Sequence, residues 1–154
     1  MFKRGLYWII GIILIDQISK YWILETFWSS NAPFSIPVTG FFELVLGWNK
    51  GVSFGLLASD NIYRQSIIIS FTLLIVIGLM IWLRHNKRTS LSVILAFIIG
   101  GALGNLIDRL RFQAVIDFAH IHIGNFSWPV FNVADIAISV GVVLLMLDIF
   151  RKKT

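Results

Sequence analysis

The sequence predicts an α-helical membrane protein of one domain, with four transmembrane helices and a small β-rich element outside the bilayer. Three observations favour this class. Hydrophobic residues make up 57% of the chain and charged residues only 14%, four long stretches lack a polar face, and basic residues gather at alternate ends of those stretches. Charged residues reach about 25% in soluble domains. A soluble protein with buried core helices is therefore the weaker interpretation, and we expect residues 1–154 to form a single integral membrane domain.

Four apolar stretches predict the spans, and each has 17 to 19 residues. An α-helix needs ~20 residues to cross a hydrocarbon core that is ~30 Å thick, so all four stretches are long enough. The spans are expected near residues 6–24, 65–83, 91–107 and 133–150.

Lysines and arginines predict the orientation of these spans. The positive-inside rule places loops that are rich in Lys and Arg in the cytoplasm. The residues that would then be cytoplasmic are Lys3, Arg4, Arg84, Lys87, Arg88, Arg151, Lys152 and Lys153. Both termini are therefore expected inside, whereas residues 25–64 and 108–132 face outward. The same charges favour contact with membrane lipid, but no basic patch with accessible aromatic residues indicates nucleic-acid binding.

The outward segments predict the β-rich element, which we expect residues 34–54 and 112–131 to form. Residues 41–46 have the composition of a strand. Residues 120–129 alternate in polarity and break at Gly124-Asn125, a two-residue hairpin signal. That turn sets a register, which would pair Ile123 with Phe126, Phe118 with Phe131 and Asp117 with Asn132.

Two aspartates in the outward segments are the main candidates for chemistry. Asp117 lies on the predicted hairpin and Asp135 in the first turn of the last span, where Asn132 is a suitable N-cap. A charge in or beside lipid costs free energy, so an acid kept there is a functional candidate. Alone, one acid could belong only to a loop and the other only to a helix cap. Brought together by the hairpin, they predict a water-activating carboxylate pair, separated by no more than one bridging water.

Polar and small residues within the first and third spans are expected to organise the helices. Asp16 and Lys20 are four residues apart and share a helix face, so they can form an ion pair that makes insertion tolerable. Gly100 and Gly104 have the spacing that lets two helices approach closely.

The third span ends in a second polar group. Asn105, Asp108 and Arg109 gather on one helix face, because they are three and four residues apart. Arg109 could pair with Asp108, or it could hold an acid of the site ionised. The spacing leaves both interpretations open.

Two histidines raise the alternative of a metallohydrolase. His120 and His122 lie on one face of the predicted strand and, with Asp117, could supply a zinc site. Their spacing matches no metal motif, however, and interfacial histidines are common. We expect no metal and no other cofactor.

Five outward-facing motifs together resemble the signal peptidase II family, the lipoprotein signal peptidases. They are Asp16-Gln-Ile-Ser-Lys20, Asn49-Lys-Gly-Val-Ser-Phe54, Gly100-Gly-Ala-Leu-Gly-Asn-Leu-Ile-Asp-Arg109, Val115-Ile-Asp-Phe118 and Phe131-Asn-Val-Ala-Asp135. The match covers all four spans in order. The chain departs from the family at Gln113, where glycine is usual, and at Ser53, where alanine is common. Gln113 is expected to change backbone freedom near the hairpin and to leave the chemistry unaffected.

The resemblance implies an aspartic endopeptidase of the bacterial inner membrane, with its active site near the outer face. Its substrates would be diacylglyceryl-modified prolipoproteins, cleaved just before the lipidated cysteine. Asp117 and Asp135 match the catalytic pair. The positions that match substrate-binding or site-organising residues are Asp16, Lys20, Asn49, Gly51, Asn105, Asp108, Arg109, Asn132 and Ala134. We expect a monomer that needs no partner besides substrate and lipid.

A non-catalytic membrane protein, such as a small carrier or a lipid-binding module, is the alternative from another class. A carrier tends to place its acids near the middle of the bilayer, often at broken helices. Asp117 and Asp135 are instead predicted at the outer ends of spans, which favours the peptidase.

Overall fold

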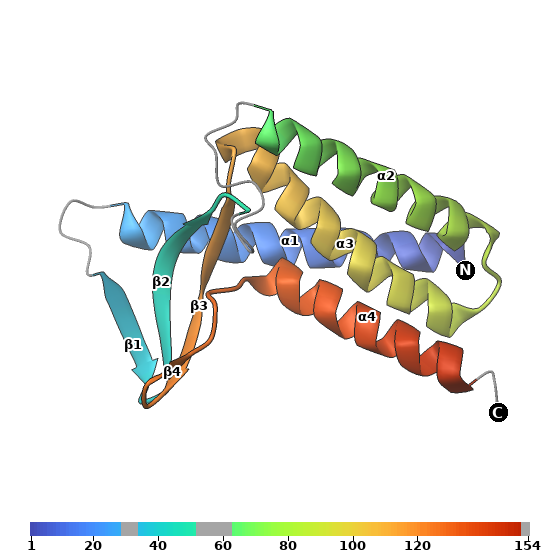
Figure 1. Cartoon of the computed structure of the whole chain (residues 1–154). Helices are drawn as coiled ribbons and strands as arrows, with labels where there is room; N and C mark the ends of the chain where they lie inside the picture. The colour runs from blue at the N-terminus through green and yellow to red at the C-terminus, as the bar shows by residue number, and fades with distance from the viewer. Residues whose placement is uncertain (29–33, 52–62, 152–154) are drawn as a thin grey trace.

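In the part of the chain that the structure describes, four long helices pack side by side and a small sheet lies at one end of the bundle (Figure 1). The computed structural model describes residues 1–28, 34–51 and 63–151. Its helices are α1 (Phe2–Phe27), α2 (Arg64–His85), α3 (Thr89–Phe112) and α4 (Val133–Arg151). All four are long and apolar enough to cross a membrane, which confirms the predicted spans. Helices α1, α2 and α3 extend past those spans at both ends, because backbone hydrogen bonding continues beyond the apolar residues.

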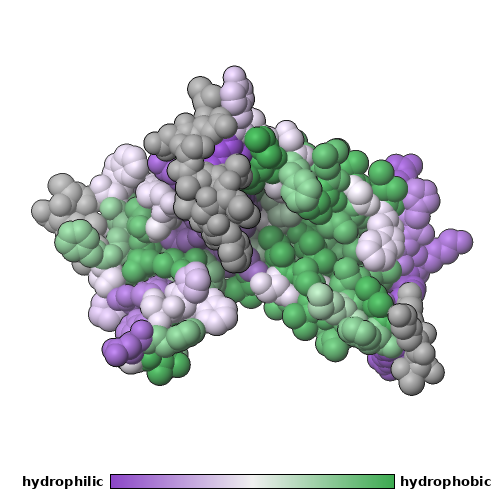
Figure 2. All heavy atoms as spheres, in the orientation of Figure 1, coloured by the Kyte–Doolittle hydropathy of each residue, from purple (hydrophilic) through white to green (hydrophobic). Residues whose placement is uncertain are grey.

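Helix α3 lies at the centre of the bundle. Of its most apolar window, 67% is buried inside the protein, against 11% to 28% for the other three helices. The other helices therefore turn most of their apolar surface outward, and Figure 2 shows this surface along the bundle. Close helix approach depends on the small residues of α3, as predicted: a methyl group at Gly100 would lie 2.9 Å from Ile12 of α1.

Within the described residues, the predicted β-rich element is a four-stranded antiparallel sheet in the order β1-β2-β3-β4. Its strands are β1 (Ser35–Thr39), β2 (Phe42–Asn49), β3 (Val115–Ile123) and β4 (Phe126–Ser127). The sheet lies at the end of the bundle opposite both termini (Figure 1). The first residues of β3 are buried against the helices, so this strand connects the sheet to the bundle. Residues 52–54 of the predicted element, including Ser53, lie outside the described residues.

The predicted hairpin register is correct at the turn and wrong beyond it. Ile123 pairs with Phe126, as expected. Farther along, the bridge partner of Phe131 is Ala119, so the register has moved by one residue, although the Phe118 N–H also donates to the Phe131 carbonyl at 3.0 Å. Pro129 has no N–H to donate to the ladder, and two residues, Pro129 and Val130, stand opposite one residue of β3. Asp117 is therefore not the ladder partner of Asn132.

Candidate active site

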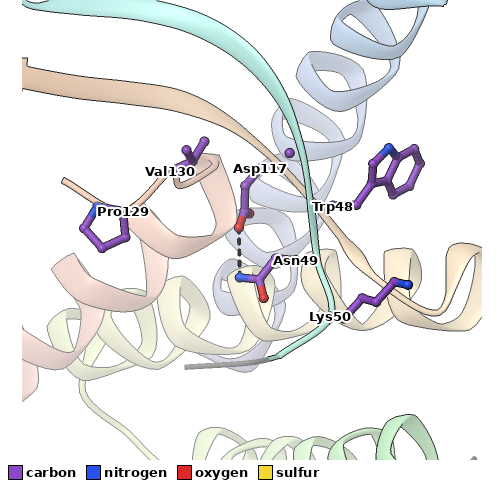
Figure 3. Close-up of a pocket in the computed structure, with 7 residues that line it drawn as sticks. Trp48, Asn49, Lys50, Asp117, Pro129 and Val130 are labelled. Atoms are coloured by element: carbon purple, nitrogen blue, oxygen red, sulfur yellow. Dashed lines mark hydrogen bonds between the residues drawn. The ribbon is translucent and has the colours of Figure 1, made fainter. Parts of the chain in front are cut away.

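Asp117 lies on β3 where the sheet meets the bundle, and its side chain is almost fully buried, with 3% exposed. Its two carboxylate oxygens accept hydrogen bonds from two asparagine amides. Asn49 Nδ2 at the end of β2 donates to Oδ2 at 2.9 Å, and Asn132 Nδ2 donates to Oδ1 at 2.7 Å. Figure 3 shows the Asn49 amide pointing at the carboxylate. Asn132 therefore reaches Asp117 with its side chain, although the strand register does not pair them.

Asp135 lies in the first turn of α4, where the predicted N-cap is present. The Asn132 side-chain oxygen accepts from the Asp135 N–H at 2.9 Å, and the Asp135 carboxylate accepts from the Asn132 N–H at 3.3 Å. This is the reciprocal pattern of a capping box. The other Asp135 oxygen accepts from Asn105 Nδ2 of α3 at 2.8 Å. Both carboxylate oxygens of Asp135 are thus held by N–H donors, as are those of Asp117.

Asn132 connects the two acids. Its side chain is fully buried, and its Nδ2 also lies 3.2 Å from the Ile116 carbonyl and 3.1 Å from Asn105 Oδ1. One asparagine therefore contacts Asp117 with its amide nitrogen and Asp135 with its amide oxygen and backbone. Among residues 1–28, 34–51 and 63–151, no ion pair neutralises either acid.

This environment raises the pKa of Asp117 from 3.8 to about 6. Burial is the largest cause, because it disfavours the charged carboxylate, and the neighbouring charge of Asp135 acts in the same direction. Hydrogen bonds from Asn49 and Asn132 and the positive charge of Lys20 act against the rise. Asp117 therefore keeps its proton at pH values where an ordinary aspartate has lost it.

Beneath the two acids, a buried lysine joins two further aspartates. Lys20 Nζ lies 2.8 Å from Asp16 Oδ2 and 2.8 Å from Asp108 Oδ2, and it donates to Asn105 Oδ1 at 3.0 Å. The predicted pair of Asp16 and Lys20 is thus confirmed, and Asp108 completes a three-residue cluster. A buried ion pair of good geometry with further hydrogen bonds can offset its desolvation.

The same cluster fixes the backbone around the site. Asp16 Oδ1 accepts from the Ala134 N–H at 2.9 Å, which holds the start of α4. Asp108 Oδ2 accepts from the Ile116 N–H at 3.2 Å, which holds β3 one residue before Asp117. The two acids of the cluster therefore set the positions of the strand and the helix that carry the two acids of the site.

Arg109 forms a direct ion pair neither with Asp108 nor with an acid of the site in the described residues. Asp108 pairs with Lys20, so the pairing of Arg109 with Asp108 is wrong. The guanidinium donates to the Asn105 carbonyl at 3.4 Å, and its Nε is buried without a hydrogen-bond partner in the described chain. Its charge interacts through space with Asp135 and Asp117, but it forms no ion pair with either within the described segments.

Two hollows open beside the acids. The first has a volume of about 410 Å³, and Asp117 lines it together with Gly47, Trp48, Asn49, Lys50, Pro129 and Val130 (Figure 3). The second has a volume of about 310 Å³ and runs beside Asp135 along α4, lined by Trp128, Phe131, Ile136, Ser139 and Val140. The carboxylates thus lie between a hollow at the sheet and a mainly apolar groove on a transmembrane helix.

Known proteins share both the sequence and the fold. The family described as signal peptidase (SPase) II, Peptidase_A8, matches residues 8–151. The chain belongs to the signal peptidase II family. The lipoprotein signal peptidase of Methylorubrum extorquens (strain PA1) is 41% identical over 152 residues, covering 97% of this chain and 87% of the relative. That of Rhodopseudomonas palustris (strain TIE-1) is 39% identical over 150 residues, covering 95% and 91%.

Two solved structures share the fold. A bacterial membrane enzyme determined by the in meso method at 2.3 Å resolution superposes with a TM-score of 0.82 at 24% identity, covering 99% of this chain and 90% of the other. A second, at 1.9 Å, gives a TM-score of 0.81 at 24% identity, covering 96% and 92%. As a member of the signal peptidase II family, the chain is a membrane aspartic peptidase.

Gln113, where the resemblance led us to expect glycine, lies at a strained backbone position. It is the C-cap of α3 and has a positive φ of 57°, the left-handed conformation that glycine adopts most easily. The residue lies at the end of the helix and not within the hairpin, so the expected effect on backbone freedom in the hairpin stays a prediction. The Gln113 N–H donates to the Arg109 carbonyl at 3.0 Å, so the residue still ends the helix in the normal way.

Two glutamines near the site were missed from the sequence. Gln17 Nε2 donates to Asp108 Oδ1 at 3.0 Å and to the Gly104 carbonyl at 3.2 Å, which joins α1 to α3. A polar residue within an apolar span was the available signal for Gln17. Gln65 Nε2 at the start of α2 donates to the Lys50 carbonyl at 3.0 Å. Nothing in the sequence distinguishes Gln65 from an ordinary interfacial residue.

The two histidines do not join Asp117. His120 Nδ1 lies 2.7 Å from Glu43 Oε1, and its Nε2 lies 2.6 Å from Ser127 Oγ, so its ring connects β2, β3 and β4. Within the described residues, no three His, Cys, Asp or Glu side chains form a group that could hold a metal ion. The zinc set considered from the sequence is thus not assembled there.

Proposed function

We propose that this protein removes the signal peptide from diacylglyceryl-modified prolipoproteins by cleaving just before the lipidated cysteine, with Asp117 and Asp135 as the catalytic pair. One observation carries the proposal: two carboxylates at the mouth of a membrane bundle are held by the same buried residue, Asn132. Sequence motifs and family membership supply the substrate class.

The arrangement suits hydrolysis by an activated water. Asp117 is the proton donor of the pair in this proposal, because burial raises its pKa to about 6. Asp135 takes a proton from water, and the resulting hydroxide forms a bond to the scissile carbonyl carbon. Asp117 gives its proton to the carbonyl oxygen, which yields a tetrahedral diol.

The diol then collapses and restores the pair. The C–N bond breaks, Asp135 passes its proton to the departing amine of the cysteine, and a diol hydroxyl returns a proton to Asp117. The products are a signal peptide with a new carboxyl terminus and a lipoprotein with a free amine. The three asparagines keep the acids in place through these transfers, since Asn49, Asn105 and Asn132 donate to their oxygens.

The two hollows match the two parts of this substrate. The hollow between β2 and residues 129–130 can take the extended peptide, and the groove along α4 can leave the lipid-modified side chain in contact with the bilayer. By the positive-inside rule, the basic end of the bundle is cytoplasmic, which places the sheet and the acids at the outer face of the inner membrane.

A cleavage assay tests this function. The purified protein is offered one precursor in two forms, with and without the diacylglyceryl group, and the products are identified by mass. We expect cleavage before the cysteine of the modified form only, unchanged by a metal chelator. Cleavage at another bond, equal cleavage of the unmodified form or loss of activity with the chelator would each contradict the proposal.

A further inference from the structure

Asn49, which donates a hydrogen bond to Asp117, is the first residue of a tight turn formed by residues 49–51. Asn49 Oδ1 accepts a hydrogen bond from the Gly51 N–H at 2.8 Å, and Gly51 has a positive φ of 80°. Because the amide oxygen is engaged within the turn, the amide nitrogen is left to donate to Asp117 Oδ2 at 2.9 Å. The position of this turn therefore decides whether Asn49 reaches the carboxylate.

Helix α2 holds the turn through one face. Gln65 Nε2 donates to the Lys50 carbonyl at 3.0 Å, at the middle residue of the turn. Ile68 shares that face of α2, because it lies three residues later, and a Cβ at Gly51 would be 2.9 Å from Ile68 Cδ1. The turn is thus held against α2 by one hydrogen bond, and Ile68 leaves no room for a side chain at Gly51.

Gln65 is a buried polar residue whose hydrogen-bonding capacity is only partly used in the described part of the chain. Its side chain is buried, with 8% exposed, yet its Oε1 has no hydrogen-bond partner in the described part of the chain. A buried acceptor without a partner costs free energy. The buried position of Gln65 therefore costs stability, while its side chain makes one hydrogen bond, to the Lys50 carbonyl in the turn beside the site.

We propose that Gln65 is a positioning residue of the active site: its hydrogen bond to Lys50 holds the 49–51 turn on α2, so that Asn49 donates to Asp117. Asn49 is one of two amides that donate to the Asp117 carboxylate, and its donation stabilises the ionised form. A displaced turn therefore changes both the geometry and the acidity of Asp117. This role rests on the proposed function, in which Asp117 exchanges protons with the substrate.

The charges around Asp117 come from every element packed against it. Asp135 of α4 raises its pKa, Lys20 of α1 lowers it, and Arg109 of α3 interacts with it through space. Lys50 at the end of β2 lines the same hollow. The Gln65 side chain donates a hydrogen bond to the turn and to none of the charged groups of Asp135, Lys20 and Arg109 in the described residues, whereas Lys50 moves with the turn. A shift in the titration of Asp117 would therefore report the position of the 49–51 turn, and the Asn49→Ala background isolates the contribution of Asn49.

Gln65→Met tests the proposal, with Ser66→Ala as its matched control on the exposed face of the same helical turn. Methionine keeps the length and removes both polar atoms, so the lost hydrogen bond is offset by loss of the unpartnered acceptor, and the melting temperature should change little. We expect kcat/KM to fall by roughly 10-fold, within the ~100-fold that a displacement of about 1 Å can cost. The alkaline limb of its pH profile should move to higher pH. Ser66→Ala should leave both unchanged.

Two further measurements test whether Gln65 acts on Asp117 through Asn49. The Asp117 carboxyl is titrated by isotope-edited infrared spectroscopy, with Asp117→Asn as the blank, and Gln65→Met should raise its midpoint. In an Asn49→Ala background, Gln65→Met should have no further effect on that midpoint. An unchanged midpoint, or an equal shift without Asn49, would overturn the role of Gln65. A raised midpoint without any change in cleavage would instead count against Asp117 as a catalytic acid.

Discussion

Replacing Asp117 by asparagine should change the stability of the protein in a way that depends on pH. Compared with the native chain, the variant should gain stability as the pH rises from acid to neutral. The folded protein holds this carboxyl with a pKa of about 6, against an ordinary value of 3.8. Below about pH 4 the carboxyl is protonated in both states and its burial has no charge penalty. As the pH rises from about 4 to about 6, the unfolded chain releases the proton first, so the native protein loses stability over this window. The asparagine side chain of the variant does not titrate, so the variant escapes this loss.

The structure sets the size of the effect. The gap between 3.8 and about 6 corresponds to about 3 kcal/mol, at about 1.4 kcal/mol for each pKa unit. Water in the hollow beside Asp117 screens part of this energy, so we expect about 1–2 kcal/mol between pH 4 and pH 7. For a chain of this length that is roughly 2–8 °C in melting temperature.

The absolute stability of Asp117→Asn is less informative than its slope with pH. Asn49 and Asn132 both direct amide N–H donors at the Asp117 side chain, and the oxygen of each is engaged elsewhere, so the NH2 group of the new asparagine would face one of these donors. That conflict costs about 1–3 kcal/mol at every pH. The difference between variant and native protein should nevertheless rise from pH 4 to pH 7.

Thermal unfolding in detergent across this pH range measures the slope, and Glu43→Gln is a control of opposite sign. Hydrogen bonding to His120 lowers the pKa of Glu43, so its carboxylate stabilises the folded protein above the ordinary pKa. Its removal should therefore cost more stability as the pH rises. A flat or falling difference for Asp117→Asn would refute the claim that burial raises its pKa.

Three further outcomes follow from the site and the bundle. The value of kcat/KM should fall about tenfold for each pH unit above about 6, because the two carboxyls of the substrate-free enzyme lose their shared proton there. A steady-state pH profile measures this fall. Gln113→Gly should stabilise the fold by about 0.5–1 kcal/mol by relieving the left-handed backbone, with cleavage unchanged; a lower melting temperature would contradict this. Gly104→Ala would place a methyl 2.6 Å from Asp16 Oδ2, so it should cost about 1–3 kcal/mol in thermal unfolding and reduce activity, whereas native-like stability would contradict this packing.

The architecture could be predicted from the sequence because the bilayer constrains it strongly. Apolar length gives the spans, and the hairpin signal at Gly124-Asn125 gives the turn between β3 and β4, both of which the structure confirms. The register beyond the turn could not be predicted, because Pro129 inserts an extra residue whose path depends on tertiary packing.

The site was predicted less completely than the fold. The ion pair of Asp16 and Lys20 follows from helix spacing alone, because both partners lie on one helix. The pairing of Lys20 with Asp108 joins residues far apart in the chain, and local spacing cannot show it. The same reason hid Gln65, whose contact with Lys50 depends on how α2 packs against the end of β2.

Single-turnover cleavage of the diacylglyceryl-modified precursor by Asp117→Asn and Asp135→Asn tests the central claim most directly. If the two acids act as one unit through Asn132, each variant should lose at least about 1000-fold in rate, and the double variant should lose little more. Both variants should remain folded, as judged by thermal unfolding. Native-like cleavage by either folded variant would contradict the claim that these two carboxylates perform the hydrolysis.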